Sequence, residues 1–90
     1  MNFFIIKRTF ILKYKKKVAV SGTIKNDINK PISEFNKLLI NNVEVPIEEV
    51  NEVLIDHNSF IAFTFKLNSF DESLLLDIIK LKEGTEVEII

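Results

Sequence analysis

The sequence predicts a small single domain of the α+β class, in which a mainly antiparallel sheet packs on helices. Three observations support this fold class. Two runs of alternating apolar and polar residues occupy the first 25 positions, two proline-initiated segments share a helix-like pattern, and an amphipathic pattern separates two later alternating runs. Together they give the order β-β-α-α-β-α-β. Ninety residues suffice for one core, so we expect one domain over residues 1–90.

Residues 1–25 are expected to form a basic β-hairpin. The first strand, residues 3–14, alternates so that one face carries Phe4, Ile6, Arg8, Phe10, Leu12 and Tyr14, and the other Lys7, Thr9 and Lys13. After a polar break at residues 15–17, residues 18–24 alternate again and predict an antiparallel second strand. Gly22 within it indicates a bulge or a close approach of two backbones.

Residues 31–57 are expected to form a helical pair. The segment PISEFNKLLI, residues 31–40, returns fifteen residues later as PIEEVNEVLI, residues 46–55. Pro31 and Pro46 suit a first helical position, acidic residues follow within one turn, and apolar residues recur at helical spacing. A competing interpretation makes residues 38–40 and 43–45 a β-hairpin around Asn41 and Asn42, which tolerate the left-handed backbone of such turns.

Residues 59–90 are expected to form a strand, a helix and a strand. Residues 59–67 are partly apolar on both faces, which is typical of a central strand. Ser69 and Glu72 match a capping box, and the helix that follows is expected to stop at Gly84. The last strand, residues 85–90, places Glu86 and Glu88 on one face, where they can meet the basic hairpin.

Charge is divided unevenly along the chain. Residues 1–30 hold eight bases and one acid, giving +7, and residues 31–90 hold four bases and twelve acids, giving -8; the sum is the net charge of -1. Either the basic segment binds an anionic partner, or it lies against acidic elements of its own fold. The hydrophobic content of 47% is high for this length, so part of the apolar surface is expected to meet a partner.

The absence of cysteine excludes disulfides, thiolate zinc sites and cysteine nucleophiles, and predicts an intracellular, cytoplasmic protein. Lys7 and Arg8 interrupt the apolar start, so neither a signal peptide nor a membrane helix is expected. With two glycines the chain has no glycine-rich phosphate loop, and no cofactor is expected.

The single histidine, His57, is the one candidate general base, and no motif marks a triad or a metal set around it. On a helix, Glu48, Glu52 and Asp56 would form an acidic ridge with oxygen ligands for a divalent cation. A solvated helix face explains the same spacing and is the favoured interpretation. We therefore expect a protein without catalytic or metal-binding residues. An enzyme would need a pocket that brings His57 and the ridge together.

The expected function is that of a non-enzymatic binding module that contacts RNA or a ribonucleoprotein. The candidate binding residues, for phosphate or for an acidic protein, are the basic residues of the hairpin: Lys7, Arg8, Lys13, Lys15, Lys16 and Lys17. Phenylalanines 60, 63 and 65 lie where sheet-based RNA binders stack bases, although core packing explains them better. The alternative is a protein-protein module, such as a homo-oligomer or a viral or mobile-element component, using surplus apolar surface. No membrane and no small-molecule substrate is indicated as a partner.

Residues 31–90 also resemble the small domain that precedes the GTPase in bacterial translation initiation factor 2. Residues 32–39 are similar to that family's first helix and residues 46–54 to its second, while residues 60–62, 69–71 and 84–88 are similar to its closing part. The link between the first two helices is longer here. Phe65 and Lys66 replace the usual Asn-Gln, and the glycine before the strand is missing. The resemblance implies the order helix, turn, helix, strand, helix, strand for residues 31–90.

Overall fold

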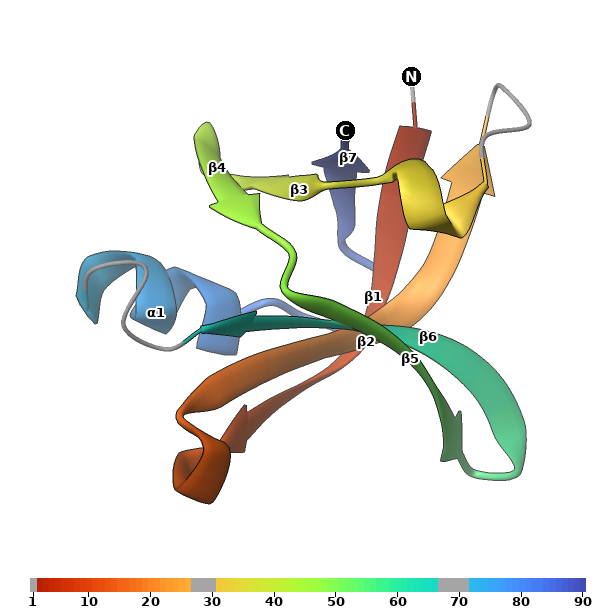
Figure 1. The fold of residues 1–90 in the computed structure, drawn as a ribbon, viewed down its shortest axis with the longest axis horizontal. Helices are drawn as coiled ribbons and strands as arrows, with labels where there is room; N and C mark the ends of the chain where they lie inside the picture. Colours follow the sequence, from red (N-terminus) through yellow and green to blue (C-terminus); the bar gives the residue numbers. More distant parts are fainter. Residues whose placement is uncertain (1, 27–30, 67–71) are drawn as a thin grey trace.

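The structure, a computed structural model that describes residues 2–26, 31–66 and 72–90, is mainly an antiparallel β-sheet (Figure 1). Its elements are β1 (Asn2–Leu12), η1 (Lys13–Lys15), β2 (Lys17–Asn26), η2 (Ile32–Glu34), β3 (Lys37–Ile40), β4 (Val43–Pro46), β5 (Glu49–Ile55), β6 (Asn58–Lys66), α1 (Glu72–Ile79) and β7 (Glu86–Ile89). The predicted α+β class with the order β-β-α-α-β-α-β is therefore wrong. Within the described residues α1 is the one α-helix, and the two η elements are single 3-10 turns.

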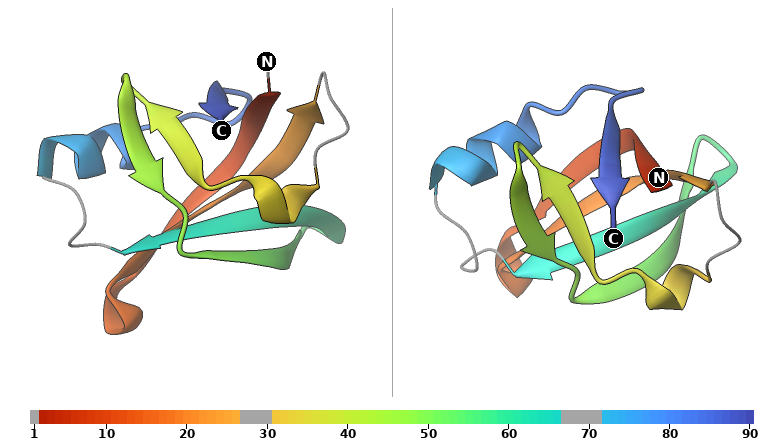
Figure 2. Two further views of the ribbon diagram at one scale, coloured as in Figure 1. Left: turned by 45° about the horizontal axis from the view of Figure 1, so that its top comes forward. Right: turned by 90° about the horizontal axis from the view of Figure 1, so that it is seen from above.

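The seven strands form one sheet in the order β4-β3-β7-β1-β2-β6-β5, with every neighbouring pair antiparallel. β4 and β5 lie at opposite ends of this order, yet only Ile47 and Glu48 separate them in the chain. Two residues cannot span a flat seven-stranded sheet, so the sheet curls until its ends approach, as Figure 2 shows. Backbone hydrogen bonds hold this step: Ile47 N–H donates to the Asn36 carbonyl at 2.8 Å, and Glu48 N–H to the Thr64 carbonyl at 2.7 Å.

The core fills the inside of the curl. Phe4 and Phe63 pack there with ring centroids 4.7 Å apart, and both are completely buried. The helix α1 contributes Leu74 and Ile78 and has exposed residues on its other side, as expected of an amphipathic helix that covers a sheet. The remaining core residues come from six strands and from the link between η2 and β3, which supplies Phe35: Ile6, Val18, Val20, Phe35, Leu38, Ile40, Val45, Phe65, Val87 and Ile89.

A β-bulge at Lys7 changes the direction of the first strand. Ile6 pairs with Gly22, but Arg8 pairs with Ser21, so Lys7 is an extra residue in β1. The fully buried Ser21 hydroxyl accepts a hydrogen bond from Arg8 N–H at 3.2 Å and donates to the Arg8 carbonyl at 3.0 Å. Gly22 lies so close to β1 that a β-carbon there would overlap the Ile5 carbonyl oxygen. Of the two roles predicted for Gly22, the close approach is confirmed, and the bulge lies opposite it in β1.

The strand β7 (Glu86–Ile89) connects the β3–β4 hairpin to β1 within the sheet. This four-residue strand lies between β3 and β1, pairing Phe3 with Glu88 on one side and Leu38 with Ile89 on the other. The β3–β4 hairpin thus joins the sheet through the last strand of the chain.

The predicted helical pair at residues 31–57 is the main error of the sequence analysis. Pro31 precedes the single 3-10 turn η2, and Pro46 ends the edge strand β4, where a missing N–H is tolerated. The competing β-hairpin interpretation is confirmed, because β3 and β4 join through Asn41 and Asn42, whose φ angles are +51° and +62°. The segments compared with the helices of the initiation-factor domain are strands and turns in this chain.

The other elements agree with the sequence pattern. The basic hairpin is confirmed as β1 and β2, although the bulge places Phe10 and Leu12 on the opposite face from Phe4 and Ile6. The strand at 59–67 is β6, which is central because β2 and β5 flank it. The helix is α1; it ends at Ile79, before Gly84, which has a φ of +89° in the turn to β7. Ser69 and the start of the predicted capping box lie outside the described residues.

Candidate interaction surface at the end of the β1–β2 hairpin

Three of the predicted basic residues, Lys7, Arg8 and Lys17, form ion pairs within the molecule. Lys7 Nζ lies 3.1 Å from Glu83 Oε2 and 5.7 Å above the ring centre of Phe60, within reach of a cation–π contact. The Arg8 guanidinium lies 3.5 Å from Asp56 Oδ2. The predicted contact between the hairpin and the last strand is also present, because Lys25 Nζ lies 3.7 Å from Glu86 Oε1. Much of the basic charge of residues 1–30 therefore faces acids of the same fold.

Lys17 has the closest partners. Its ammonium lies 3.0 Å from Glu49 Oε1 and 3.2 Å from Glu48 Oε1, so one cation joins β2 to the start of β5. Hydrogen bonds to Glu49 and then Glu48 raise the pKa of Lys17 above its ordinary value, and the bond from Lys17 lowers the pKa of the Glu49 carboxyl. Both groups stay charged at neutral pH. Lys17 is thus a structural cation, and its availability to phosphate is low.

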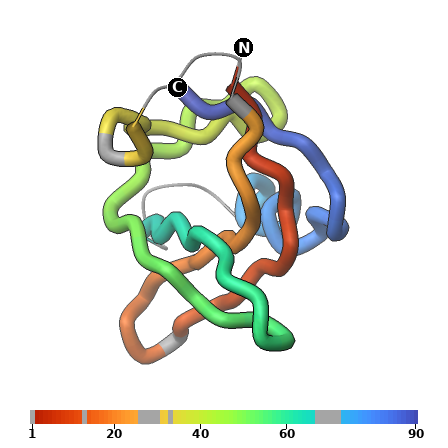
Figure 3. Tube along the Cα trace, turned by 90° about the vertical axis from the view of Figure 1, so that its right-hand side faces the viewer, coloured from red at the N-terminus to blue at the C-terminus, as the bar shows by residue number. Residues whose placement is uncertain are grey.

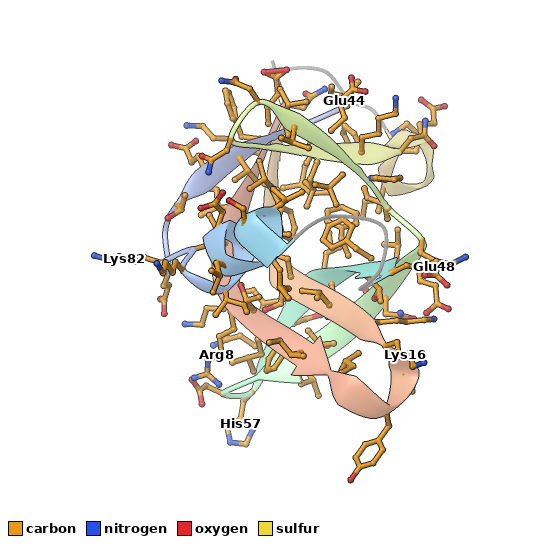
Figure 4. All side chains as sticks on the ribbon, turned by 90° about the vertical axis from the view of Figure 1, so that its left-hand side faces the viewer. Arg8, Lys16, Glu44, Glu48, His57 and Lys82 are labelled. Atoms are coloured by element: carbon orange, nitrogen blue, oxygen red, sulfur yellow. The ribbon has the colours of Figure 1, made fainter. Side chains whose placement is uncertain are left out.

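Lys15 and Lys16 form the basic end of the hairpin. Both are exposed, and no ion pair found among the described residues includes them. Lys16 has a φ of +53° and closes the turn between η1 and β2. Figure 4 shows Lys16 at the outer end of the hairpin, away from Lys82 on the other side of the molecule. The backbone of Lys13 lies in η1 beside them.

Exposed apolar side chains surround these lysines. Beyond the bulge β1 extends past β7, so its end is not covered by the curl, and Phe10, Ile11 and Leu12 expose 39%, 40% and 36% of their surface. Tyr14 in η1 is fully exposed. A shallow depression of about 340 Å³ is lined by Ile11, Leu12, Tyr14 and Lys15. We call residues 10–12 and 14–16 the hairpin end; Figures 1 and 3 show it on the opposite side of the molecule from both chain termini.

The sequence analysis identified the lysines of this surface and missed its apolar part. Alternation placed Phe10, Leu12 and Tyr14 in the core with Phe4, because a bulge at Lys7 leaves no clear mark in the sequence. The length of the run was the available signal. A strand reaching residue 12 is longer than a small curled sheet can cover. Of the three candidate stacking residues, Phe63 and Phe65 are completely buried, and Phe60 packs beneath Lys7.

The residues considered for catalysis are not brought together. His57 lies exposed in the two-residue turn between β5 and β6, where Asp56 and His57 have φ angles of +51° and +67°. Glu48 precedes the other end of β5, about 23 Å away for a seven-residue strand. The acidic ridge does not form, because residues four apart in an extended chain lie about 13 Å from each other, too far to share one cation. No group of three metal-ligating side chains occurs within residues 2–26, 31–66 and 72–90.

Comparison with models of protein families, with curated proteins and with solved structures gave no match to this chain. Within the part of the chain that the structure describes, no helix is both long and apolar enough to span a membrane. The candidate site therefore stands on its own geometry: an exposed aromatic ring, three aliphatic or aromatic neighbours and two lysines at the end of a projecting hairpin.

Proposed function

We propose that this domain is a protein-binding module that uses the hairpin end as its contact surface. The observation that carries the proposal is the joint exposure of Phe10, Ile11, Leu12 and Tyr14 on one projecting element. The core of the domain buries Phe4, Phe35, Phe63 and Phe65, and the four exposed apolar side chains of this element take no part in that core. Clusters of this kind, rimmed by charge, are typical of protein contact sites.

The charges favour a protein partner over RNA. Nucleic-acid affinity rests on many lysine–phosphate contacts, and here Lys7 and Lys17 contact Glu83 and Glu49 instead. Lys15 and Lys16 take part in none of the ion pairs found among the described residues, and two lysines make a small electrostatic contribution to nucleic-acid binding. They suit the rim of an apolar protein contact, where they select an acidic neighbour.

RNA binding is the second candidate, because of one specific feature. Tyr14 is fully exposed and stands next to Lys15 and Lys16, and an aromatic ring beside cations is a common platform for an unpaired base. Such binding would weaken steeply with salt and would be lost on reversing the charge of Lys15 and Lys16.

Position 14 serves both tests: a crosslinking amino acid can replace Tyr14, and Tyr14 itself, the single tyrosine of a chain without tryptophan, reports binding by its fluorescence. A photo-crosslinking amino acid at position 14, introduced in living host cells, is expected to give discrete protein adducts. The same amino acid at Lys82, which is exposed and lies away from Lys16 and the hairpin end, is expected to give none. Ile11→Lys in the crosslinking chain is expected to remove the adducts, after circular dichroism has shown that the variant folds.

Titration of the purified protein with a single-stranded oligouridylate tests the other candidate. Quenching of Tyr14 fluorescence in low salt, with loss at high salt and no protein adducts in cells, would replace the proposal by RNA binding. No adducts and no quenching would leave the hairpin end without a binding role.

A further inference from the structure

The half of the sheet that carries the hairpin end is a four-stranded antiparallel unit with two open edges. Beyond the bulge, β1 pairs only with β2, while β2 pairs with β6 and β6 with β5. On its other side β1 is covered as far as Thr9: Ile6 N–H donates to the Thr85 carbonyl, Gly84 N–H donates to the Ile6 carbonyl, and the Thr9 hydroxyl donates to the Ile78 carbonyl. Among the described residues no strand pairs with β1 on that side from residue 10 on, and none pairs with the outer side of β5. Every second residue along such an edge directs its backbone N–H and C=O outward, where another strand can bind.

The two edges run in opposite directions. An antiparallel unit of four strands alternates up and down, so β1 and β5 are antiparallel to each other. A second copy shifted sideways without being inverted therefore places its β1 antiparallel to the β5 of the first copy. The sheet can continue from one molecule into the next without a change of pairing type.

The edges are also opposite in charge. Residues 8–16 contain Arg8, Lys13, Lys15 and Lys16 and no acid, giving +4; residues 48–56 contain Glu48, Glu49, Glu52 and Asp56 and no base, giving -4. Both edges carry exposed apolar side chains. On β5 these are Val50 and Leu54, which expose 40% and 77% of their surface, and on β1 they are Phe10, Ile11 and Leu12.

The ion pairs within one molecule use part of this charge. Lys17 holds Glu48 and Glu49, so Glu52 and Asp56 are the acids of the β5 edge that remain for a partner. Arg8 and Asp56 are separated by 3.5 Å and both are well exposed, so this pair contributes little and can be exchanged. Glu52 on β5, and Lys15 and Lys16 at the hairpin end, take part in none of the ion pairs found among the described residues. Like edges repel: β1 against β1 opposes cations, and β5 against β5 opposes acids. The unlike pairing remains.

We propose that the partner of the hairpin end is a second copy of this chain, whose β5 edge pairs with β1 in a head-to-tail assembly. This inference rests on the proposed function, since it names the protein that the hairpin end binds. A head-to-tail contact leaves one free edge at each end of an assembly, so it closes into a ring or grows into a filament. The uncovered residues 10–12 of β1 are about 10 Å long, so one contact is small and the association depends on concentration.

Charge exchange tests the assembly. Tyr14→Glu with Lys15→Glu makes the hairpin end acidic, and Glu52→Lys with Leu54→Lys makes the β5 edge basic; all four side chains are exposed, so both double variants are expected to fold. Lys82→Glu is the matched control, because it reverses an exposed charge outside residues 8–16 and 48–56. Sedimentation velocity of the full chain, from about 10 μM to 1 mM, measures association.

We expect the wild-type chain and Lys82→Glu to associate as concentration rises, and each double variant alone to associate at least tenfold more weakly. An equimolar mixture of the two double variants is expected to associate again, because each acidic hairpin end then meets a basic β5 edge. A dimer that persists in one double variant alone would show a like-edge contact and overturn the proposal. A wild-type chain that stays monomeric to 1 mM overturns it as well, and adducts with another protein at position 14 would then leave the proposed function intact.

Discussion

Replacing Gly22 by alanine is expected to be among the most damaging single-methyl additions in the chain. The new β-carbon would overlap the backbone carbonyl oxygen of Ile5 and lie 3.1 Å from Cε2 of Phe4. A flexible side chain could move away from such a contact, but Ile5 is fixed by pairing with β2 on one side and β7 on the other. Overpacking in a core costs about 1–3 kcal/mol, and a clash with held backbone belongs at the upper end, about 3 kcal/mol.

That cost is a large part of the total, since a 90-residue domain has a free energy of unfolding of about 5–13 kcal/mol. It corresponds to a fall in Tm of about 12–24 °C, measured by circular dichroism, with the free energy taken from urea unfolding. Gly84→Ala is the matched control. Gly84 has a φ of +89° and open space around it, so alanine there costs backbone strain alone, about 1 kcal/mol. Equal losses in the two variants would refute the argument from close approach.

Two further predictions concern β2. Ser21→Ala removes the hydroxyl that bridges Arg8 N–H and C=O, and it is expected to lower the free energy of unfolding by about 1–3 kcal/mol. The control Ser59→Ala changes an exposed serine and is expected to leave that free energy nearly unchanged. Equal free energies for the two variants in urea unfolding would contradict the role of the Ser21 hydroxyl in holding the bulge. The pKa of Glu49 in the folded state lies below its ordinary 4.5, so the pair with Lys17 stabilises the fold above pH 4.5 and this contribution is lost as pH falls through the lowered pKa. In Lys17→Met, NMR titration is expected to show the Glu49 carboxyl back near its ordinary pKa, and an unmoved titration curve would argue against the pairing.

The part of the fold that the sequence predicted correctly has an unambiguous period. Three segments each fit either the two-residue period of a strand or the 3.6-residue period of a helix, but not both: the alternating hairpin, the run that became β6, and the amphipathic pattern of α1. The repeat at residues 31–40 and 46–55 fits both. Its two copies are indeed alike, but each ends as a strand followed by a two-residue turn with positive φ, Asn41 and Asn42 in one and Asp56 and His57 in the other. The repeat therefore marks two β-hairpins.

Residue type carried the information that spacing did not. Residues 43–55 contain six β-branched side chains, which favour extended backbone, and their abundance outweighs acids placed near two prolines. The buried positions Leu38, Ile40 and Val45 also alternate, with Val45 facing Leu38 across the hairpin. A helical stripe and a short alternating strand share these same positions, so spacing alone could not decide between them.

The candidate site could be predicted only in part, for a different reason. The lysines of the hairpin were visible in the sequence, but their partners lie far along the chain. Lys17 meets Glu49, and Lys7 meets Glu83. Which cations are neutralised depends on tertiary contacts, and so does the exposure of Phe10 and Leu12, which follows from one extra residue in β1.

The position of β7 has a consequence for the way the chain folds. Strands β1, β2, β6 and β5 can pair without it, but among the described residues β7 is the strand that pairs the β3–β4 hairpin with β1. Pairing Phe3 with Glu88 closes a loop of nearly the whole sequence. Such closure is slow relative to local hairpin formation. We expect a nascent chain to hold β3 and β4 as a hairpin that is not paired with β1 until β7 has been synthesised and has left the ribosome.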